Sequence, residues 1–269
     1  MFQGDFKMDI VDIFKESLYF PTKDLNKLVI LGVIFIISNI PTFLLGFGLS
    51  LDNFDPSGIL SLIFGILSLI VSIYLFGYFI NMLRNTIDYQ DELPEFNDFS
   101  DHIVVGIKGI LIAIFYFIIP TIIAFILAFV TGAFGKLGEI VMLNGQAIPD
   151  QLVSEFLLSS SIAIILSCII FIIFSLLYII ALVRFADKGN MGAAVEFGEV
   201  FKTIGNIGWG KYIVWYILMG IVGFFLAIIS GILIFIPIIG VIINILIIRS
   251  YSMIFTAKAT GLIYNEKDN

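Results

Sequence analysis

The stretch from Ile110 to Val130 reads ILIAIFYFIIPTIIAFILAFV and contains no charged residue. A helix of about 20 apolar residues is long enough to cross the hydrocarbon core of a bilayer. The stretch therefore predicts a transmembrane helix. Pro120 lies near its middle and predicts a kink or a short break at that point.

Similar apolar runs recur along the 269-residue chain, in which 60% of the residues are apolar and only 13% are charged. A soluble domain carries about 25% charged residues, so the composition excludes a soluble protein, a disordered chain and a nucleic-acid binder. The last two runs are separated only by the turn around Pro237 and Gly240, which predicts a tight antiparallel hairpin. In total, the runs predict six transmembrane helices, at residues 28–49, 58–83, 104–134, 157–183, 212–235 and 238–262.

The distribution of Lys and Arg predicts the orientation of these helices. If the N-terminus is cytoplasmic, Lys136 alone among the 14 Lys and Arg residues falls outside. Positive charges are enriched in the cytoplasmic loops of membrane proteins. We therefore expect a multi-pass protein of the cell membrane with both termini in the cytoplasm. Aromatic residues typical of the interface gather at the inner end of the fifth span: Trp209, Tyr212, Trp215 and Tyr216.

Three short segments on the predicted cytoplasmic side are similar to one another, and each precedes a pair of spans. They are centred on Phe14, Phe99 and Phe201. We expect each to form a short amphipathic helix in the inner membrane interface. The pattern is clearest in the first, where one helical face carries Ile10, Val11, Phe14 and Leu18.

Small residues recur at every fourth position in the first helix of each predicted pair. Such ridges let helices approach closely in lipid. A chain rich in Gly, Ala and Phe also produces these matches by chance, but several features keep the same order and favour a repeat. We therefore expect an all-α polytopic protein with a single integral membrane domain over residues 1–269. It is built from three repeats at 9–90, 95–190 and 196–262, each a short amphipathic helix followed by a helical hairpin. The ridges are Ser38, Thr42 and Gly46; Ala124, Ala128 and Gly132; and Gly223, Ala227 and Gly231.

Two motifs carry a resemblance to a known family. The first is Gly77-Tyr78 followed by Arg84-Asn85-Thr86 and by Asp91-Glu92-Leu93-Pro94-Glu95-Phe96. The second is Arg184-Phe185-Ala186 with Gly192-Ala193-Ala194 and Phe197. Over roughly residues 10–262, the chain resembles an uncharacterised prokaryotic membrane family that is common in archaea, domain of unknown function 4013. The resemblance implies a multi-span architecture and implies no activity.

The central parts of the predicted spans contain no charged residue and no histidine, with the exception of Arg249 in the sixth span. If the sixth helix runs to Tyr264, the side chain lies too deep to reach water easily and faces the bundle interior. If the helix leaves the bilayer near residue 256, the side chain snorkels to the interface, which is the simpler interpretation. No carboxylate lies near Arg249 in the sequence, so a proton relay is not predicted.

Other groups of polar residues are typical of structural roles. The acidic stretch 88–101 could bind a divalent cation, but it lacks the pattern of a calcium loop and is typical of a solvated turn. The segment 205–211 nearly spells a phosphate-binding loop, yet Tyr212 replaces the hydroxyl residue that would hold magnesium. His102, the only histidine, is expected at the surface or in a helix cap. Cys168, the only cysteine, allows neither a disulfide framework nor a thiolate metal site.

These observations predict a protein that is not an enzyme, with no catalytic, metal-binding or cofactor-binding residues and no cofactor. Its expected partners are the lipid bilayer and, at the cytoplasmic loops, another protein; nucleic acid is not expected, and the oligomeric state is not predicted. The favoured function is a non-catalytic membrane scaffold or assembly factor, with a dry bundle whose ridges are filled by neighbouring helices, because few polar residues are available to line a path. The alternative is a channel or facilitator for a neutral or apolar solute, with a cavity lined by Asn39, Ser68, Ser72, Ser175 or Asn244.

Overall fold

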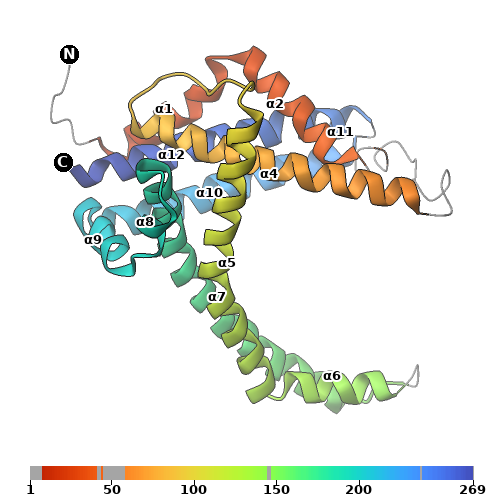
Figure 1. Cartoon of the computed structure of the whole chain (residues 1–269). Helices are drawn as coiled ribbons and strands as arrows, with labels where there is room; N and C mark the ends of the chain where they lie inside the picture. The colour runs from red at the N-terminus through yellow and green to blue at the C-terminus, as the bar shows by residue number, and fades with distance from the viewer. Residues whose placement is uncertain (1–7, 41–43, 45–57, 144–146, 237, 269) are drawn as a thin grey trace. The chain divides into compact units, whose positions relative to one another are not determined.

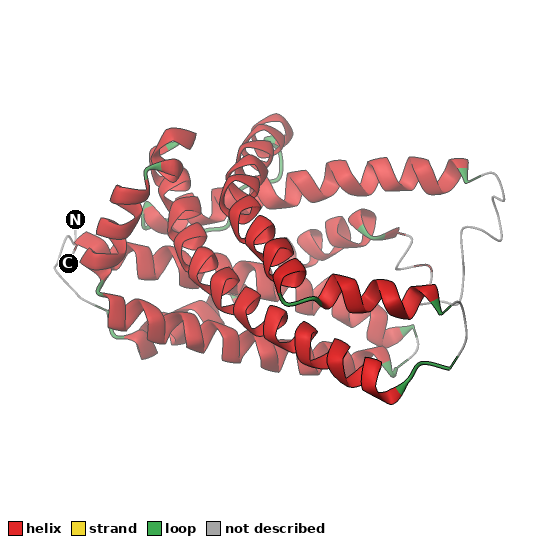
Figure 2. Ribbon diagram, turned by 90° about the horizontal axis from the view of Figure 1, so that it is seen from below, coloured by secondary structure: helices red, strands yellow, loops and turns green. Residues whose placement is uncertain are grey.

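The computed structural model describes residues 8–40, 44, 58–143, 147–236 and 238–268, and within these ranges every regular element is helical (Figure 1, Figure 2). This confirms the all-α prediction. A π-helical turn, Asn244–Arg249, joins the last two helices, and short 3-10 turns lie at Phe20–Thr22 and Glu266–Asp268. The helices are α1 (Ile10–Tyr19), α2 (Leu25–Ser38), α4 (Ile59–Ile87), α5 (Phe99–Val130), α6 (Ala133–Met142), α7 (Asp150–Lys188), α8 (Met191–Val195), α9 (Phe197–Ile207), α10 (Trp209–Ile234), α11 (Ile239–Ile243) and α12 (Ser250–Asn265).

Five helical segments are long and apolar enough to cross a membrane: α4, α5, α7, α10 and the segment Ile239–Asp268. They coincide with five of the six predicted spans, and their length and composition indicate a membrane protein. The other predicted span, 28–49, begins as the 14-residue apolar helix α2, but residues 41–43 and 45–49, Pro41 included, lie outside the described residues. The sixth crossing and the three-hairpin arrangement therefore stay predictions.

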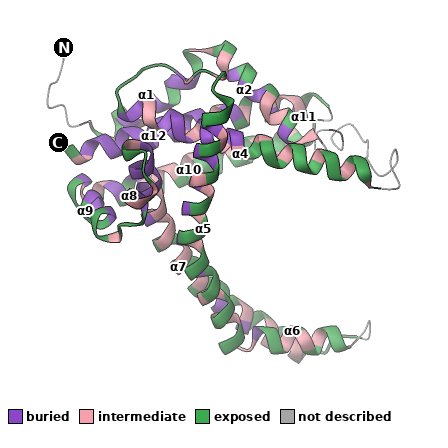
Figure 3. Ribbon diagram, viewed as in Figure 1, coloured by how far each residue is buried: buried purple, intermediate pink, exposed green. Residues whose placement is uncertain are grey.

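The chain divides into two compact units, one formed by Met1–Ile110 and Ile180–Asn269 and the other by Leu111–Ile179. In the first unit, the buried core lies where α4, α7 and α12 end (Figure 3). Tyr78, Phe185 and Tyr264 are among its fully buried side chains. Elsewhere large apolar side chains are exposed, as lipid-facing surfaces require because lipid tails are as apolar as these side chains. The prediction of a single domain over residues 1–269 stays a prediction.

Helices of the first unit touch most closely at glycines that the predicted ridges do not include. A side chain on Gly77 of α4 would collide with the backbone carbonyl of His102 on α5, and one on Gly32 of α2 would collide with the carbonyl of Leu246. By contrast, a Cβ atom on Gly223 or Gly231 would meet no described atom within 4 Å. The prediction that this ridge of α10 is filled by a neighbouring helix is therefore wrong for the described residues.

The expected amphipathic helices form in two of the three places. Pro21 lies in the 3-10 turn that separates α1 from α2, and Gly208, with φ of 96°, separates α9 from α10. The short helix expected around Phe99 is wrong, because α5 begins at Phe99 and continues without a break. The segment after Phe99 has no equivalent breaker, since Gly106 stays helical where α5 crosses the Ile73 carbonyl of α4.

α1 packs against α12 through a different face from the one predicted. Ile13 and Ser17 are fully buried, whereas Val11 and Leu18 of the predicted apolar face are 54% and 39% exposed. The ring of Phe14 lies 6.1 Å from that of Phe255. A second contact is the Tyr251 hydroxyl, which donates to the Leu18 carbonyl at 2.7 Å. The helix is thus held by protein contacts while Val11 and Leu18 remain available to lipid.

The second unit contains an amphipathic helix that the sequence analysis missed. Gly132, with φ of 82°, ends α5 and begins α6. Lys136 of α6 pairs with Glu155 of α7 at 2.7 Å. The opposite surface of α6 carries exposed Phe134, Leu137, Val141 and Met142. α5 itself runs through Pro120 as one helix, so the break predicted there does not occur.

Candidate functional site

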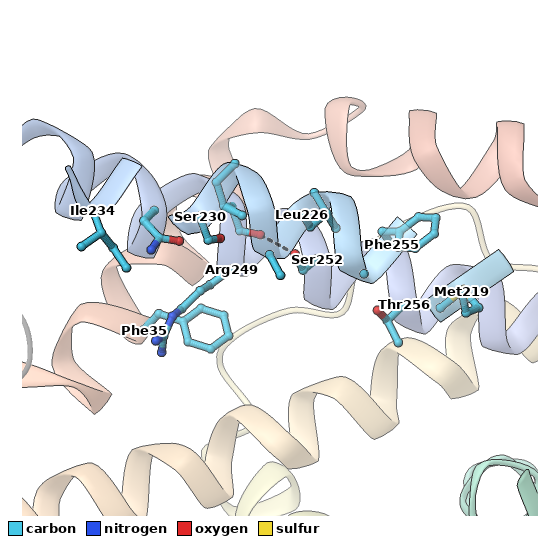
Figure 4. Close-up of a pocket in the computed structure, with 13 residues that line it drawn as sticks. Phe35, Met219, Leu226, Ser230, Ile234, Arg249, Ser252, Phe255 and Thr256 are labelled. Carbon is cyan, nitrogen blue, oxygen red and sulfur yellow. Dashed lines mark hydrogen bonds between the residues drawn. The ribbon is translucent and has the colours of Figure 1, made fainter. Parts of the chain in front are cut away.

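A pocket of about 600 Å³ lies in the first unit, between α10 and the last helical segment (Figure 4). Ligand pockets in proteins commonly have about 300–1,000 Å³. Its walls come from four elements: Phe35 of α2; Met219, Gly223, Leu226, Ala227, Ser230 and Ile234 of α10; Asn244, Ile248 and Arg249 of the π-helical turn; and Ser252, Phe255 and Thr256 of α12. Gly223 and Ala227 thus form a pocket wall.

The pocket is long compared with the thickness of a bilayer. On α10 its lining runs from Met219 to Ile234, which is about 22 Å of helix at a rise of about 1.5 Å per residue. On the last segment it runs from Asn244 to Thr256, or about 18 Å. The hydrocarbon core of a bilayer is about 30 Å thick. The pocket is therefore an elongated groove along two segments that are long and apolar enough to span a membrane.

Arg249 projects into this pocket at mid-depth. Its helix continues to Asn265, which is the condition under which the side chain was expected to lie too deep to reach water easily. Lys258, on the same helix, lies about 14 Å further along the axis. Figure 4 shows the side chain of Arg249 extending toward the ring of Phe35. Arg249 is exposed, and it makes no ion pair or hydrogen bond to any described residue.

The π-helical turn gives the pocket its polar wall. Its wider turn brings residues five positions apart closer to one face than an α-helix does, so Asn244 and Arg249 both line the pocket. The turn packs against α2 where Gly32 meets the carbonyl of Leu246. A larger residue at Gly32 would push α2 away from the turn. Glycine at this one position therefore positions the two polar groups.

The polar wall differs from the one that the sequence predicted. Of the five residues expected to line a cavity, only Asn244 lines this pocket. The Asn39 amide instead donates to the hydroxyl of its neighbour Ser38 at 2.7 Å. Sequence reasoning missed Ser252 and Thr256, although they stand three and seven positions after Arg249 and so share its helical face. The Ser252 hydroxyl donates to the Ile248 carbonyl at 2.7 Å.

A layer of ion pairs lies at the end of the first unit where α12 finishes. Lys258 is only 5% exposed; its ammonium lies 3.0 Å from Glu16 and 3.5 Å from Asp91. Lys23 also pairs with Asp91, and this hydrogen bond holds the pKa of the Asp91 carboxyl below its ordinary value. Lys27 pairs with Glu95 at 2.7 Å. Two carboxylates of the acidic stretch 88–101 therefore bind lysines and fix the loop to the helices.

His102 is not at the surface as predicted, because α5 crosses α4 closely at Gly77. Its side chain is 2% exposed and lies between the rings of Tyr74 and Tyr78, 5.0 and 5.3 Å away. Asn81 places its Nδ2 3.1 Å from Nδ1 of His102 and donates to Asp101 at 2.9 Å. This cluster joins α4 to α5.

The sequence profile of one protein family, described as a protein of unknown function (DUF4013), matches residues 59–236. The chain belongs to the DUF4013 family. No curated protein and no solved structure matches it. The match confirms the resemblance stated above over a shorter range. It includes the α10 wall of the pocket, while Asn244 and Arg249 lie beyond it.

The arginines of the two DUF4013 motifs have structural roles in this protein. Arg84 donates from Nε to the Ala186 carbonyl at 3.2 Å, which ties the end of α4 to the end of α7. Arg184 donates from Nε to the Ala193 carbonyl at 3.0 Å and from a terminal nitrogen to the Thr203 hydroxyl at 3.2 Å. These bonds hold α8 and α9 against α7. The motifs therefore organise one end of the helices.

The segment that nearly spells a phosphate-binding loop also has a structural role. Gly208 forms the bend between α9 and α10, and a helix rather than a strand precedes it. Lys211 pairs with Glu266 at 2.5 Å and donates to the Met8 carbonyl at 2.6 Å. Glu266 is 2% exposed and accepts from the Met8 amide at 2.8 Å. Lys211 thus connects α10 to both ends of the described chain.

Proposed function

We propose that this DUF4013 protein is a facilitator-type membrane protein that binds its solute in the pocket between α10 and α12. The observation that carries the proposal is Arg249, a charged residue on the wall of that pocket that pairs with no described residue. A charged side chain inside a membrane is costly and commonly marks a substrate or ion pathway. No chemical conversion of the solute is proposed.

The arrangement of small residues supports this function over a dry scaffold. A scaffold requires the ridges to be filled by neighbouring helices, whereas Gly223 and Ala227 line the pocket. In the second unit, Ala124 and Ala128 likewise line a separate pocket of about 410 Å³ against α7. Both ridges leave space beside the helix, and a solute path needs such space.

A scaffold role has one observation in its favour, the layer of ion pairs around Lys258. It fixes α1 and the loop 88–98 to α12 and leaves carboxylates such as Glu92 and Asp98 exposed. A rigid acidic surface of this kind suits a basic protein partner. Loss of a co-purifying partner after Glu92→Lys and Asp98→Lys, with solute access unchanged, would favour the scaffold.

The proposed orientation places both termini in the cytoplasm of a cell-membrane protein. Its support is that basic residues from distant parts of the sequence meet in the same ion-paired layer: Lys23 before α2, Lys27 in α2 and Lys258 in α12. The positive-inside rule assigns such a layer to the cytoplasmic face. The pocket then lies between this layer and the opposite face of the membrane.

Thiol labelling tests the proposed path. In a Cys168→Ser background, Ala227→Cys places a thiol in the pocket, and Ile228→Cys places one on the neighbouring position of α10, which is 43% exposed but outside the pocket lining. A membrane-impermeant methanethiosulfonate should label Ala227→Cys at least tenfold faster in proteoliposomes, because only the pocket admits water. Equal slow rates at both positions would contradict the facilitator function.

A further inference from the structure

We infer that the ligand of this pocket is an amphiphilic anion, with a carboxylate or phosphate group beside Arg249 and a hydrocarbon chain in the apolar space around it. The inference rests on the proposed function and names its substrate class. It is carried by the charge of the polar wall, by the donors beside it and by an adjoining apolar pocket.

Charge complementarity requires an anion. Among the 13 described residues that line the pocket, Arg249 is the one charged residue and none carries a carboxylate. Arginine presents a planar fork of N–H donors, which matches the two oxygens of a carboxylate or phosphate. Because no described residue of the lining supplies a counter-charge, a neutral solute would leave the guanidinium unpaired in an apolar medium, which is unfavourable.

Neighbouring donors extend the site for the anionic group. The Asn244 amide shares the π-helical turn with Arg249, and the Thr256 hydroxyl lies two helical turns further along the same face. The Asn244 amide can donate to an oxygen that Arg249 leaves unpaired, whereas Thr256 lies too far along the helix to reach the same anionic group. The Ser230 hydroxyl of α10 also lines the pocket.

Apolar space lies directly beyond Phe35. This ring lines the pocket of Arg249 and also a second pocket of about 320 Å³, whose other walls are Leu75, Phe76, Phe79 and Met253. The two pockets are therefore adjacent. A hydrocarbon chain that crosses Phe35 would fill the second pocket while its anionic group stays at Arg249. A small inorganic anion would leave that space empty.

Native mass spectrometry of the intact protein in detergent tests the inference with three probes. Oleate carries both parts of the ligand, oleyl alcohol has the same chain without the charge, and acetate has the carboxylate without the chain. We expect one oleate per chain at saturation. The apparent affinity should fall at least tenfold in Arg249→Gln and recover in part in Arg249→Lys. Lys202→Gln removes one exposed positive charge outside the pocket and should bind as the parent does.

The outcomes separate the parts of the inference. Equal affinity of the parent and Arg249→Gln, or equal affinity for oleate and oleyl alcohol, would overturn the anionic site. If acetate saturates the site at the same concentration as oleate, the hydrocarbon chain contributes nothing to binding. This result would overturn the claim that the ligand is an amphiphile and would leave a small free anion as the ligand. If Arg249→Gln fails to give a monodisperse gel-filtration peak, Asn244→Ala replaces it and should weaken oleate binding several-fold; unchanged binding would then count against the site.

Failure of this inference is distinguishable from failure of the proposed function. If Ala227→Cys reacts in water but oleate does not bind, the path stands and the ligand class is wrong. If oleate binds through Arg249 while Ala227→Cys and Ile228→Cys react equally slowly, the site stands and the facilitator function is wrong.

Discussion

Lys258 is a charged side chain that the fold keeps 5% exposed, with its ammonium 4.5 Å from the centre of the Phe20 ring. It joins Glu16 of α1 and Asp91 of the loop after α4 to α12. The two carboxylates remain partly solvated, so losing the lysine does not strand a buried charge. Its main contribution is to hold α1 in place.

The variant Lys258→Met tests this contribution because it keeps the hydrocarbon stem and removes the ion pairs. We expect the free energy of unfolding to fall by about 1 kcal/mol and tryptic cleavage at Lys15 and Lys23 to become faster. Thermal melts and a timed digest measure the two effects. Lys202→Met, on the exposed side of α9, is the control. Identical digestion patterns for parent and Lys258→Met would mean that other contacts hold α1.

Asp91 makes the same layer sensitive to acid. The Lys23 hydrogen bond holds the pKa of Asp91 below its ordinary value of 3.8. A carboxyl whose pKa is lower in the folded state stabilises the fold at pH values above its unfolded pKa, and this contribution disappears as the pH falls through the folded pKa. We therefore expect the Tm to fall when the pH is lowered below about 4. The fall should be smaller in Asp91→Asn. Parallel Tm–pH curves for the two proteins would refute this.

The sequence identifies Arg249 because it is an isolated charge in an apolar run, but it does not show which residues surround it. The residues around Arg249 are set by the π-helical turn and by the contact at Gly32, and both depend on how α2 packs. His102 illustrates the same limit. A histidine beside Asp101 is typical of a surface, and its burial follows from the crossing of α4 and α5.

At the scale of the helix, some glycines allow close contact between helices and others face open space, and a pair of substitutions can distinguish the two. Gly77 lies against the backbone of α5, whereas Gly223 faces open space in the described structure. Gly77→Ala should force the helices apart and destabilise the protein by about 1–3 kcal/mol. Gly223→Ala should be neutral or stabilising by about 0.5–1 kcal/mol, since alanine favours a helix. Thermal melts in detergent measure both, and equal effects would contradict the assigned packing.

Spans were predicted well because a run of about 20 apolar residues has few alternatives to a transmembrane helix. Shorter elements were predicted less well. The ten-residue helix α6 follows directly from α5 and is marked only by Gly132, whose positive φ the sequence does not reveal. The expected helix at Phe99 lacked a breaker and merged into α5. Amphipathic pattern alone therefore does not define where a helix begins.

On the scale of the whole molecule, the orientation is open to direct test. In a Cys168→Ser background, cysteines at Glu92 and Asn190 should resist an impermeant thiol reagent on intact cells, because both positions are exposed on the predicted cytoplasmic side. A cysteine at Glu139, on the exposed side of α6, should react. Two further positions that the sequence suggests for the outer side, Asn53 and Gln146, lie outside the described residues. Labelling of Glu92→Cys without lysis would reverse the orientation.

The most direct test of the central account is the rate at which an impermeant methanethiosulfonate labels Ala227→Cys in the presence and absence of oleate. The account predicts that saturating oleate slows labelling at least tenfold, that acetate leaves the rate unchanged, and that Arg249→Gln abolishes the protection. Ile228→Cys, outside the pocket lining, should react at the same slow rate with and without oleate. An Ala227→Cys labelling rate that oleate does not change would contradict the account.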